Sequence, residues 1–190
     1  MQSKEFAVLV RRIQDSGADL FEKHEAFGEL VMRLQDMAYG YAYSILSNRQ
    51  VAQDAAQEAF LTAYQSIDQL RDPAAFPAWL RRIVASYCSH QVRDDRTAAQ
   101  GLQQGQTSDE SDLSALVEGR ELRERVMAAI HALPEHERTT TILYYINGYS
   151  QREVAAFLEV SVDAIKKRLE RARRQLMQEM LDMVGEQLME

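Results

Sequence analysis

The stretch from Ser150 to Leu176 constrains the fold most, because it predicts two helices joined by a tight turn. Ser150 and Glu153 form an S-x-x-E capping box, which satisfies free backbone amides where a helix starts. After a turn at Glu159, Ser161 can cap a second helix by accepting a hydrogen bond from the backbone. The sequence therefore predicts a helix-turn-helix near the C-terminal end of the chain.

The second of these helices is basic outside one apolar stripe. Ile165, Leu169, Ala172 and Leu176 share one face at helical spacing. The other faces carry the cations Lys166, Lys167, Arg168, Arg171, Arg173 and Arg174. A short helix with an apolar seam and a basic outer face suits the major groove of DNA. The alternative is an ordinary surface helix with solvated charges.

Composition limits the other possibilities. The net charge of −7 argues against general nucleic-acid coating, although a local basic patch can still bind phosphate. The single cysteine, Cys88, allows no internal disulfide and no cysteine-based zinc site, and the four histidines are scattered. We expect no metal, cofactor or catalytic set. Neither a membrane span nor a signal peptide is apparent, which predicts a cytoplasmic protein with no membrane insertion.

The chain as a whole predicts an all-α fold. Apolar periodicity indicates helices at residues 4–15, 25–46, 51–67 and 78–93, whereas 19–24 give no clear pattern. Residues 97–114 have the Gln-, Ser- and Gly-rich composition of a flexible linker, so we expect two small helical domains.

The second domain begins with an apolar stripe of Leu122, Val126, Ala129, Ile130 and Leu133. Residues 139–146 have strand propensity, but we predict helix, because a capped helix rather than a partner strand follows Gly148. The tail after Met177 continues helically, with a break expected at Gly185.

Four segments in this order resemble a known family. They are FGELVMRLQDMAYGYAYSIL, QDAAQEAFLTAY, FPAWLRRI and the run from Leu133 to Leu176. Together they resemble regions 2 and 4 of an extracytoplasmic-function (ECF) sigma factor of bacterial RNA polymerase, in the sigma-70 family. The resemblance implies an N-terminal extension (1–24), region 2 (25–96), a linker (97–117), region 4 (118–177) and a C-terminal tail (178–190).

The resemblance also implies a function and a set of site residues. A sigma factor of this family binds core polymerase, places region 4 on the −35 element and uses region 2 to open the −10 element. The polymerase-binding residues would be Asp54, Gln57 and Glu58, with Phe60 anchoring the helix beneath them. The −10 residues would be Trp79, Arg81, Arg82, Ser86, Arg93 and Arg96, although Trp79 also suits a core position. The −35 residues would be Ser150, Gln151, Arg152, Lys166, Lys167, Arg168, Arg171, Arg173 and Arg174.

Several positions depart from the family pattern. Glu159 stands where the family usually has glycine in the turn, and Asp163-Ala164 replaces its usual Gly-Thr. Ser86 and His90 replace the usual Asn and Asp, and Gln53 replaces a common acid. The changes at Glu159, Asp163-Ala164, Ser86 and His90 leave the promoter sequence open, whereas Gln53 predicts a weaker affinity for core polymerase. Thr62, beside the polymerase-binding motif, is a candidate for phosphorylation, with an exposed helix threonine as the alternative.

Two other functional classes stay open at this point. One is a helix-turn-helix regulator that binds duplex operator DNA without joining a polymerase. The other is a helical adaptor that never contacts nucleic acid. The resemblance additionally suggests an anti-sigma factor as a protein partner, though nothing in the sequence identifies one.

Overall fold

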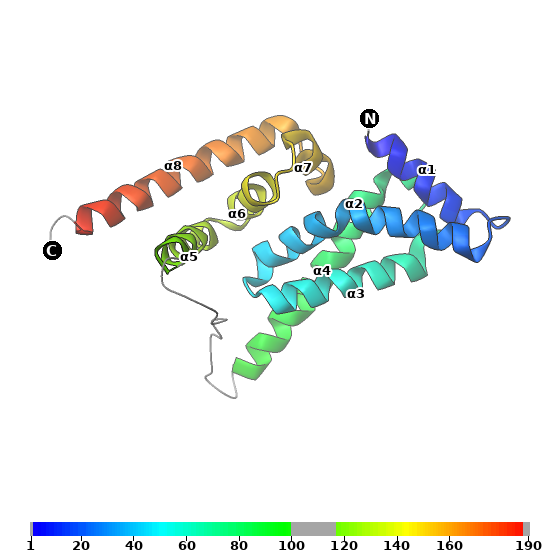
Figure 1. Ribbon diagram of the computed structural model, residues 1–190, viewed down its shortest axis with the longest axis horizontal. Coiled ribbons are helices and arrows are strands. Elements are labelled where there is room, and N and C mark those ends of the chain that lie inside the picture. The colour runs from blue at the N-terminus through cyan, green and yellow to red at the C-terminus, as the bar shows by residue number, and fades with distance from the viewer. Residues whose placement is uncertain (1, 100–116, 188–190) are drawn as a thin grey trace.

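The computed structural model describes residues 2–99 and 117–187, which are helical and contain no strand (Figure 1). The N-terminal unit (residues 2–99) contains α1 (Gln2–Gln14), α2 (Leu20–Leu46), α3 (Arg49–Ser66) and α4 (Phe76–Ala99), with 3-10 turns η1 (Ile67–Gln69) and η2 (Pro73–Ala75). The C-terminal unit (residues 117–187) contains α5 (Val117–Ala132), α6 (Glu135–Thr141), the π-helical turn η3 (Ile142–Ile146), α7 (Gln151–Leu158) and α8 (Val162–Gln187). The all-α prediction is confirmed. Most of the expected linker, residues 100–116, lies outside the described residues.

Helix α2 begins earlier than the periodicity predicts. A capping box that sequence reading missed lies at its start, where the Asp19 carboxylate accepts from the Glu22 amide at 2.8 Å. In return, the Glu22 carboxylate accepts from the Asp19 amide at 3.3 Å. Residues 20–24 are therefore helical because these side chains satisfy the free amides of the first turn.

Helix α1 is part of the N-terminal core. Phe6, Leu9, Val10 and Ile13 are all buried against the neighbouring helices. The Gln14 amide donates to the carbonyls of Ile67 and Leu70 at 2.8 and 2.9 Å, which ties the end of α1 to the loop after α3. The N-terminal extension therefore supports the same core as the helices that follow it.

Small side chains let α3 pack closely against α2 and α4. The residues expected to face inward, Ala55, Ala59, Phe60 and Ala63, are buried, as are Ala52 and Ala56. Alanine keeps the helix propensity high while allowing the helix axes to approach. Larger buried side chains of α2 and α4, among them Leu30, Phe76 and Leu80, pack around these alanines' helix.

The C-terminal unit corrects two details of the sequence prediction. Leu122 and Val126 were expected in the apolar stripe of α5, but they are 60% and 39% exposed, and only Ala129, Ile130 and Leu133 are buried. Helix α5 packs against α6 and α8, and its buried residues are in its last turn and the loop that follows. Residues 139–146 are helical as predicted, and α8 runs through Gly185 without the expected break.

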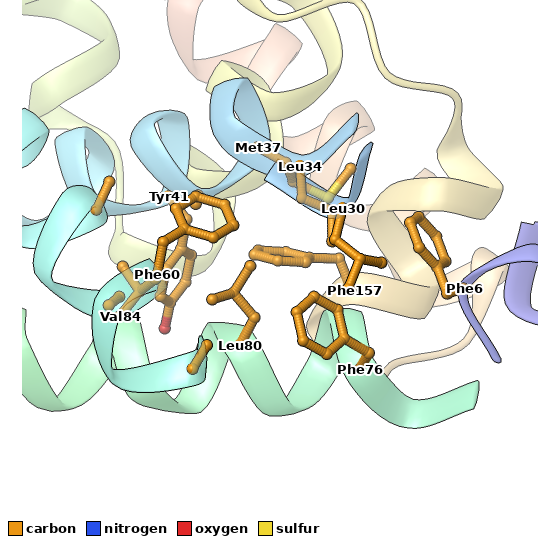
Figure 2. Close-up of a cluster of buried hydrophobic side chains, with 14 of the residues drawn as sticks. Phe6, Leu30, Leu34, Met37, Tyr41, Phe60, Phe76, Leu80, Val84 and Phe157 are labelled. Carbon is orange, nitrogen blue, oxygen red and sulfur yellow. The ribbon is translucent and has the colours of Figure 1, made fainter. Parts of the chain in front are cut away.

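The two units share one hydrophobic core, which the sequence did not predict. Helix α7 packs against α4, and α6 and η3 pack against α2. Figure 2 shows Phe157 of α7 among Leu30, Tyr41, Leu80 and Phe76 of the N-terminal unit. Phe157 is 1% exposed, and its ring meets that of Tyr41 edge to face at a centroid distance of 5.7 Å.

Within the described residues, no helix is both long and apolar enough to cross a membrane.

Candidate nucleic-acid and polymerase interfaces

The helix-turn-helix is built from the caps that the sequence predicts. The Glu153 carboxylate accepts from the Ser150 amide at 2.7 Å, and the Ser150 hydroxyl accepts from the Glu153 amide at 3.3 Å. The Ser161 hydroxyl accepts from the Ala164 amide at 3.1 Å, which caps α8. Val154 and Ala155 are buried, and α7 packs against α8, so the two helices are held together.

Helix α8 exposes the predicted basic face. Ile165, Leu169 and Ala172 are buried and Leu176 is half-buried, whereas Arg168 is the only half-buried member of its six cations. The exposed cations are Lys166, Lys167, Arg171, Arg173 and Arg174. At the start of α7, Ser150 and Arg152 are exposed and Gln151 is half-buried.

Acidic neighbours orient several of these cations. The Lys166 ammonium lies 3.3 Å from the Asp163 carboxylate, and Arg174 lies 3.2 Å from Glu170. Arg171 reaches across to Glu137 of α6 at 2.9 Å, and the Glu137 side chain is only 10% exposed. A hollow of about 360 Å³ between α6 and the start of α8 is lined by Lys167, Arg168 and Arg171, among others. These contacts position the basic groups beside the helix-turn-helix.

The predicted polymerase-binding residues lie together on one outer edge of α3. Asp54, Gln57 and Glu58 are all exposed, and Phe60 is buried beneath the same helix. The Asp54 carboxylate accepts from the Gln50 amide at 3.1 Å. The arrangement leaves two carboxylates open to a basic partner surface.

Helix α4 carries the predicted −10 residues. Trp79 is half-buried and packs near Phe76, at a centroid distance of 5.9 Å, so it serves the core as well as the surface. Trp79, Arg82, Ser86 and His90 line an open hollow of about 510 Å³ together with Thr62, Ile83 and Tyr87. Arg93 is exposed one turn beyond the hollow. The Arg96 side chain lies outside the described residues.

Thr62 lines this hollow, and its hydroxyl also makes a contact between two helices. It lies 2.7 Å from the Tyr87 hydroxyl and is half-buried between α3 and α4. It is therefore engaged in a helix–helix contact rather than standing free on the surface, and its phosphorylation stays an untested hypothesis.

Glu159 joins the two predicted DNA-binding sets, a contact that sequence reading missed. Its carboxylate lies 2.8 Å from the Arg81 guanidinium and 2.6 Å from that of Arg82. The Arg81 Nε also donates to the Phe157 carbonyl at 2.9 Å. The hydrogen bonds from Arg82 and then Arg81 lower the pKa of Glu159 below its ordinary value. The sequence shows that Glu159 replaces the family's usual glycine, but it does not show that Arg81 and Arg82 bind the Glu159 carboxylate.

Comparison with known proteins decides the family. A sequence model of sigma-70 region 2 matches residues 30–97, and one of sigma-70 region 4 matches residues 123–176. The ECF RNA polymerase sigma-E factor of Escherichia coli (strain K12) is 32% identical over 177 residues, covering 87% of this chain and 89% of the relative. The chain belongs to the ECF family of RNA polymerase sigma factors.

Two further relatives agree with this assignment. The probable RNA polymerase sigma factor RfaY of Xanthomonas campestris pv. campestris is 34% identical over 163 residues, which are 83% of this chain and 41% of RfaY. This ECF sigma factor therefore spans less than half the length of that relative. The solved structure of CnrH in complex with the cytosolic domain of CnrY matches with a TM-score of 0.59 and 26% identity, covering 93% of this chain and 97% of CnrH.

Family membership excludes the two alternative classes raised by the sequence. An ECF sigma factor is a DNA-binding regulatory subunit that joins core RNA polymerase and directs initiation at promoters. The helix-turn-helix is therefore neither that of a free-standing operator-binding regulator nor part of an adaptor without nucleic-acid contacts. The region 2 match lies within the N-terminal unit, and the region 4 match lies within the C-terminal unit.

Proposed function

We propose that α8 reads the −35 element, α4 holds the separated −10 strand and the acidic edge of α3 contacts core polymerase. The exposed basic face of α8 is the observation that carries this assignment. A helix with its apolar seam buried and five exposed cations fits the major groove, and lysine and arginine can contact both base edges and phosphates. Arg152 and the α7 start would bind phosphate and set the register.

On α4, the residues around the open hollow have the chemistry that single-stranded DNA requires. Arg82 and Arg93 offer cations to the backbone, while the half-buried Trp79 and Tyr87 offer aromatic surface to an unstacked base. The same hollow contains Ser86 and His90, the two positions that depart from the family pattern. We propose that these two side chains set which −10 base is preferred.

On α3, Asp54 and Glu58 would face a basic helical surface of the polymerase, with Gln57 between them. The role needs only binding, so we propose that the chain has no catalytic activity of its own. It would act in the cytoplasm, where the polymerase transcribes. A protein partner is also proposed, an anti-sigma factor, since the structurally similar CnrH was solved with a bound protein, CnrY.

The test compares the wild-type chain with Lys166→Ala/Lys167→Ala on a promoter mapped from a genomic library. It measures promoter binding at several salt concentrations and transcription initiation by core polymerase. We expect weaker promoter binding, with the slope of log affinity against log salt reduced by about 2, because each lost phosphate contact removes roughly one released counterion. Lys4→Ala/Lys23→Ala is the matched control, since these are the chain's two other lysines. Equal initiation by both double variants would rule out the −35 assignment.

A further inference from the structure

Glu137 differs from the other acids that pair with cations of α8, because it is buried and belongs to a different helix. It lies in the first turn of α6, which packs against α8 (Figure 1). The Glu137 side chain is only 10% exposed, and its carboxylate lies 2.9 Å from the Arg171 guanidinium. A buried carboxylate is costly unless it is paired, and within the described residues Arg171 is the cation that pairs with it.

Two other ion pairs of the basic face lie within α8 itself and are open to solvent. Lys166 pairs with Asp163, whose side chain is 81% exposed. Arg174 pairs with Glu170, whose side chain is 63% exposed. Solvent screens such pairs, so they hold a long side chain in place only weakly. In the part of the chain that the structure describes, Arg171 is therefore the cation of this face that an acid of a second helix holds.

The pair leaves most of the Arg171 guanidinium free to bind. A guanidinium carries several N–H donors in a planar fork, and the Glu137 carboxylate accepts from Nη1. The Arg171 side chain is 63% exposed, and it borders the hollow between α6 and the start of α8 together with Lys167. Its remaining donors can therefore bind the acceptors of a guanine in the major groove, with less loss of side-chain freedom than an unheld arginine would suffer.

The charge of Glu137 and its contact with Arg171 have opposite effects on DNA binding. A negative carboxylate beside a surface that binds DNA weakens binding to every sequence, because it repels phosphate. Holding an arginine in one orientation instead favours the sequence that matches that orientation. Removal of the carboxylate should thus raise the general affinity and lower the preference for the correct sequence.

We propose that Glu137 is a positioning residue for −35 recognition, which orients Arg171 of α8 toward the base edges and so contributes to the choice of sequence. The inference rests on the proposed function, in which α8 reads the −35 element. Glu137 needs no contact with DNA for this role, since it acts through Arg171.

The test measures sequence preference in the holoenzyme, which is core polymerase with the full chain bound. The preference is the affinity for a promoter fragment with its mapped −35 element, divided by the affinity for the same fragment with that element scrambled. Glu137→Gln keeps the size of the side chain and removes its charge. The ratio should fall by about tenfold, because a well-placed bidentate contact discriminates against a wrong base by about that factor. The affinity for the scrambled fragment should not fall, because the lost charge repels phosphate.

Glu135→Gln is the matched control, with the same substitution in the same short helix at an exposed position. It should keep the wild-type ratio. A partial loss of folded protein lowers the apparent affinity for both fragments equally, so it leaves the ratio unchanged. A wild-type ratio for Glu137→Gln would overturn the inference, as would an equal fall for Glu135→Gln.

A second background shows whether Glu137 acts through Arg171. Arg171→Ala should lower the ratio at least as far as Glu137→Gln does. Adding Glu137→Gln to Arg171→Ala should lower the ratio no further, because the two residues form one coupled pair. A further fall in this double variant, which local unfolding of the C-terminal unit would also cause, would contradict the positioning role.

Failure of the proposed function gives a different pattern. If α8 does not read the −35 element, Arg171→Ala and Lys166→Ala/Lys167→Ala would both keep the wild-type ratio. If only the positioning role is wrong, these two variants still lower the ratio, whereas Glu137→Gln does not.

Discussion

Glu159 illustrates what one residue contributes at an unusual backbone position. A non-glycine residue in the left-handed region costs about 1–2 kcal/mol, yet glycine there could make neither ion pair with α4. Arg81 is the better-ordered partner, because its side chain is 19% exposed and also donates to the Phe157 carbonyl. Arg82 is 63% exposed, so solvent screens its share of the interaction.

Also at the residue scale, the acidic edge of α3 gives a direct prediction. Asp54→Asn/Glu58→Gln should weaken binding to core polymerase by about tenfold, or about 1.4 kcal/mol, because two carboxylates facing a basic partner lose their charge. The loss should shrink at high salt. Fluorescence anisotropy of the labelled protein against core polymerase measures it.

The control for this experiment is Asp68→Asn/Glu25→Gln, which removes the same charges from exposed positions elsewhere in the N-terminal unit. Glu25 pairs with Arg12 on the surface, a contact worth little to stability. If the control and the α3 variant lost equal affinity, the effect would be one of net charge and the assigned edge would be wrong.

At the scale of elements, α1 shows how a segment outside the family match can be structural. The region 2 model begins at residue 30, but α1 lies before it and contributes four large buried side chains to the core. Arg33 of α2 pairs with Glu5 of α1 at 2.7 Å, and Gln14 caps two carbonyls in the loop after α3. Helix α1 therefore forms the core of the N-terminal unit together with α2, α3 and α4.

Two valines of α1 make a matched test of this role. Val10 is 0% exposed and Val8 is 57% exposed, so the same change to alanine probes burial alone. Val10→Ala should lower the free energy of unfolding by about 2 kcal/mol, through lost apolar burial and the cavity left behind. Val8→Ala should change it by less than about 0.5 kcal/mol. Urea unfolding measures both, and equal effects would place α1 outside the core.

At the scale of the whole molecule, His131 makes the packing of the two units against each other sensitive to pH. Its ring lies against Tyr43 of α2, its Nδ1 contacts Ser47, and its buried Nε2 has no partner among the described residues. Burial, together with the nearby Arg138 charge, lowers the pKa of His131 below its ordinary 6.5. A form with the two units separated, in which His131 has its ordinary pKa, therefore binds a proton more readily than the docked form.

The sign of the pH effect follows from this difference. Below pH 6.5, separation of the two units takes up a proton, so the docked form loses stability as the pH falls from 6.5 through the lowered pKa of His131. The lowered pKa of Glu159 acts in the same direction but only below its ordinary 4.5. The radius of gyration of the full chain should thus increase as the pH is lowered from about 7.5 to about 5.5.

His131→Asn is the appropriate control, because its amide can keep the Ser47 contact but cannot titrate. This variant should show the same radius at both pH values. A pH-dependent expansion that persisted in His131→Asn would contradict the assignment to this histidine.

The sequence by itself determined the elements and their chemistry. Helical periodicity, the Ser150–Glu153 capping box and the basic face of α8 depend on neighbours within a few residues, so they were predictable from local order. The start of α2 was locally encoded too, in Asp19 and Glu22, although apolar periodicity did not reveal it. The exposure of Leu122 and Val126 was not predictable, because it depends on which element covers them.

Only the tertiary structure decided how the two units meet. Phe157 enters the N-terminal core, and the absence of a side chain at Gly40 of α2 leaves room for the Asn147 side chain of the C-terminal unit. Glu159 binds Arg81 and Arg82 from 78 and 77 positions away along the chain. No local pattern encodes such a contact, because each partner is also consistent with an exposed or separately buried position in its own unit. The pairing follows from the shape of the two docked surfaces, which exists only once both have folded.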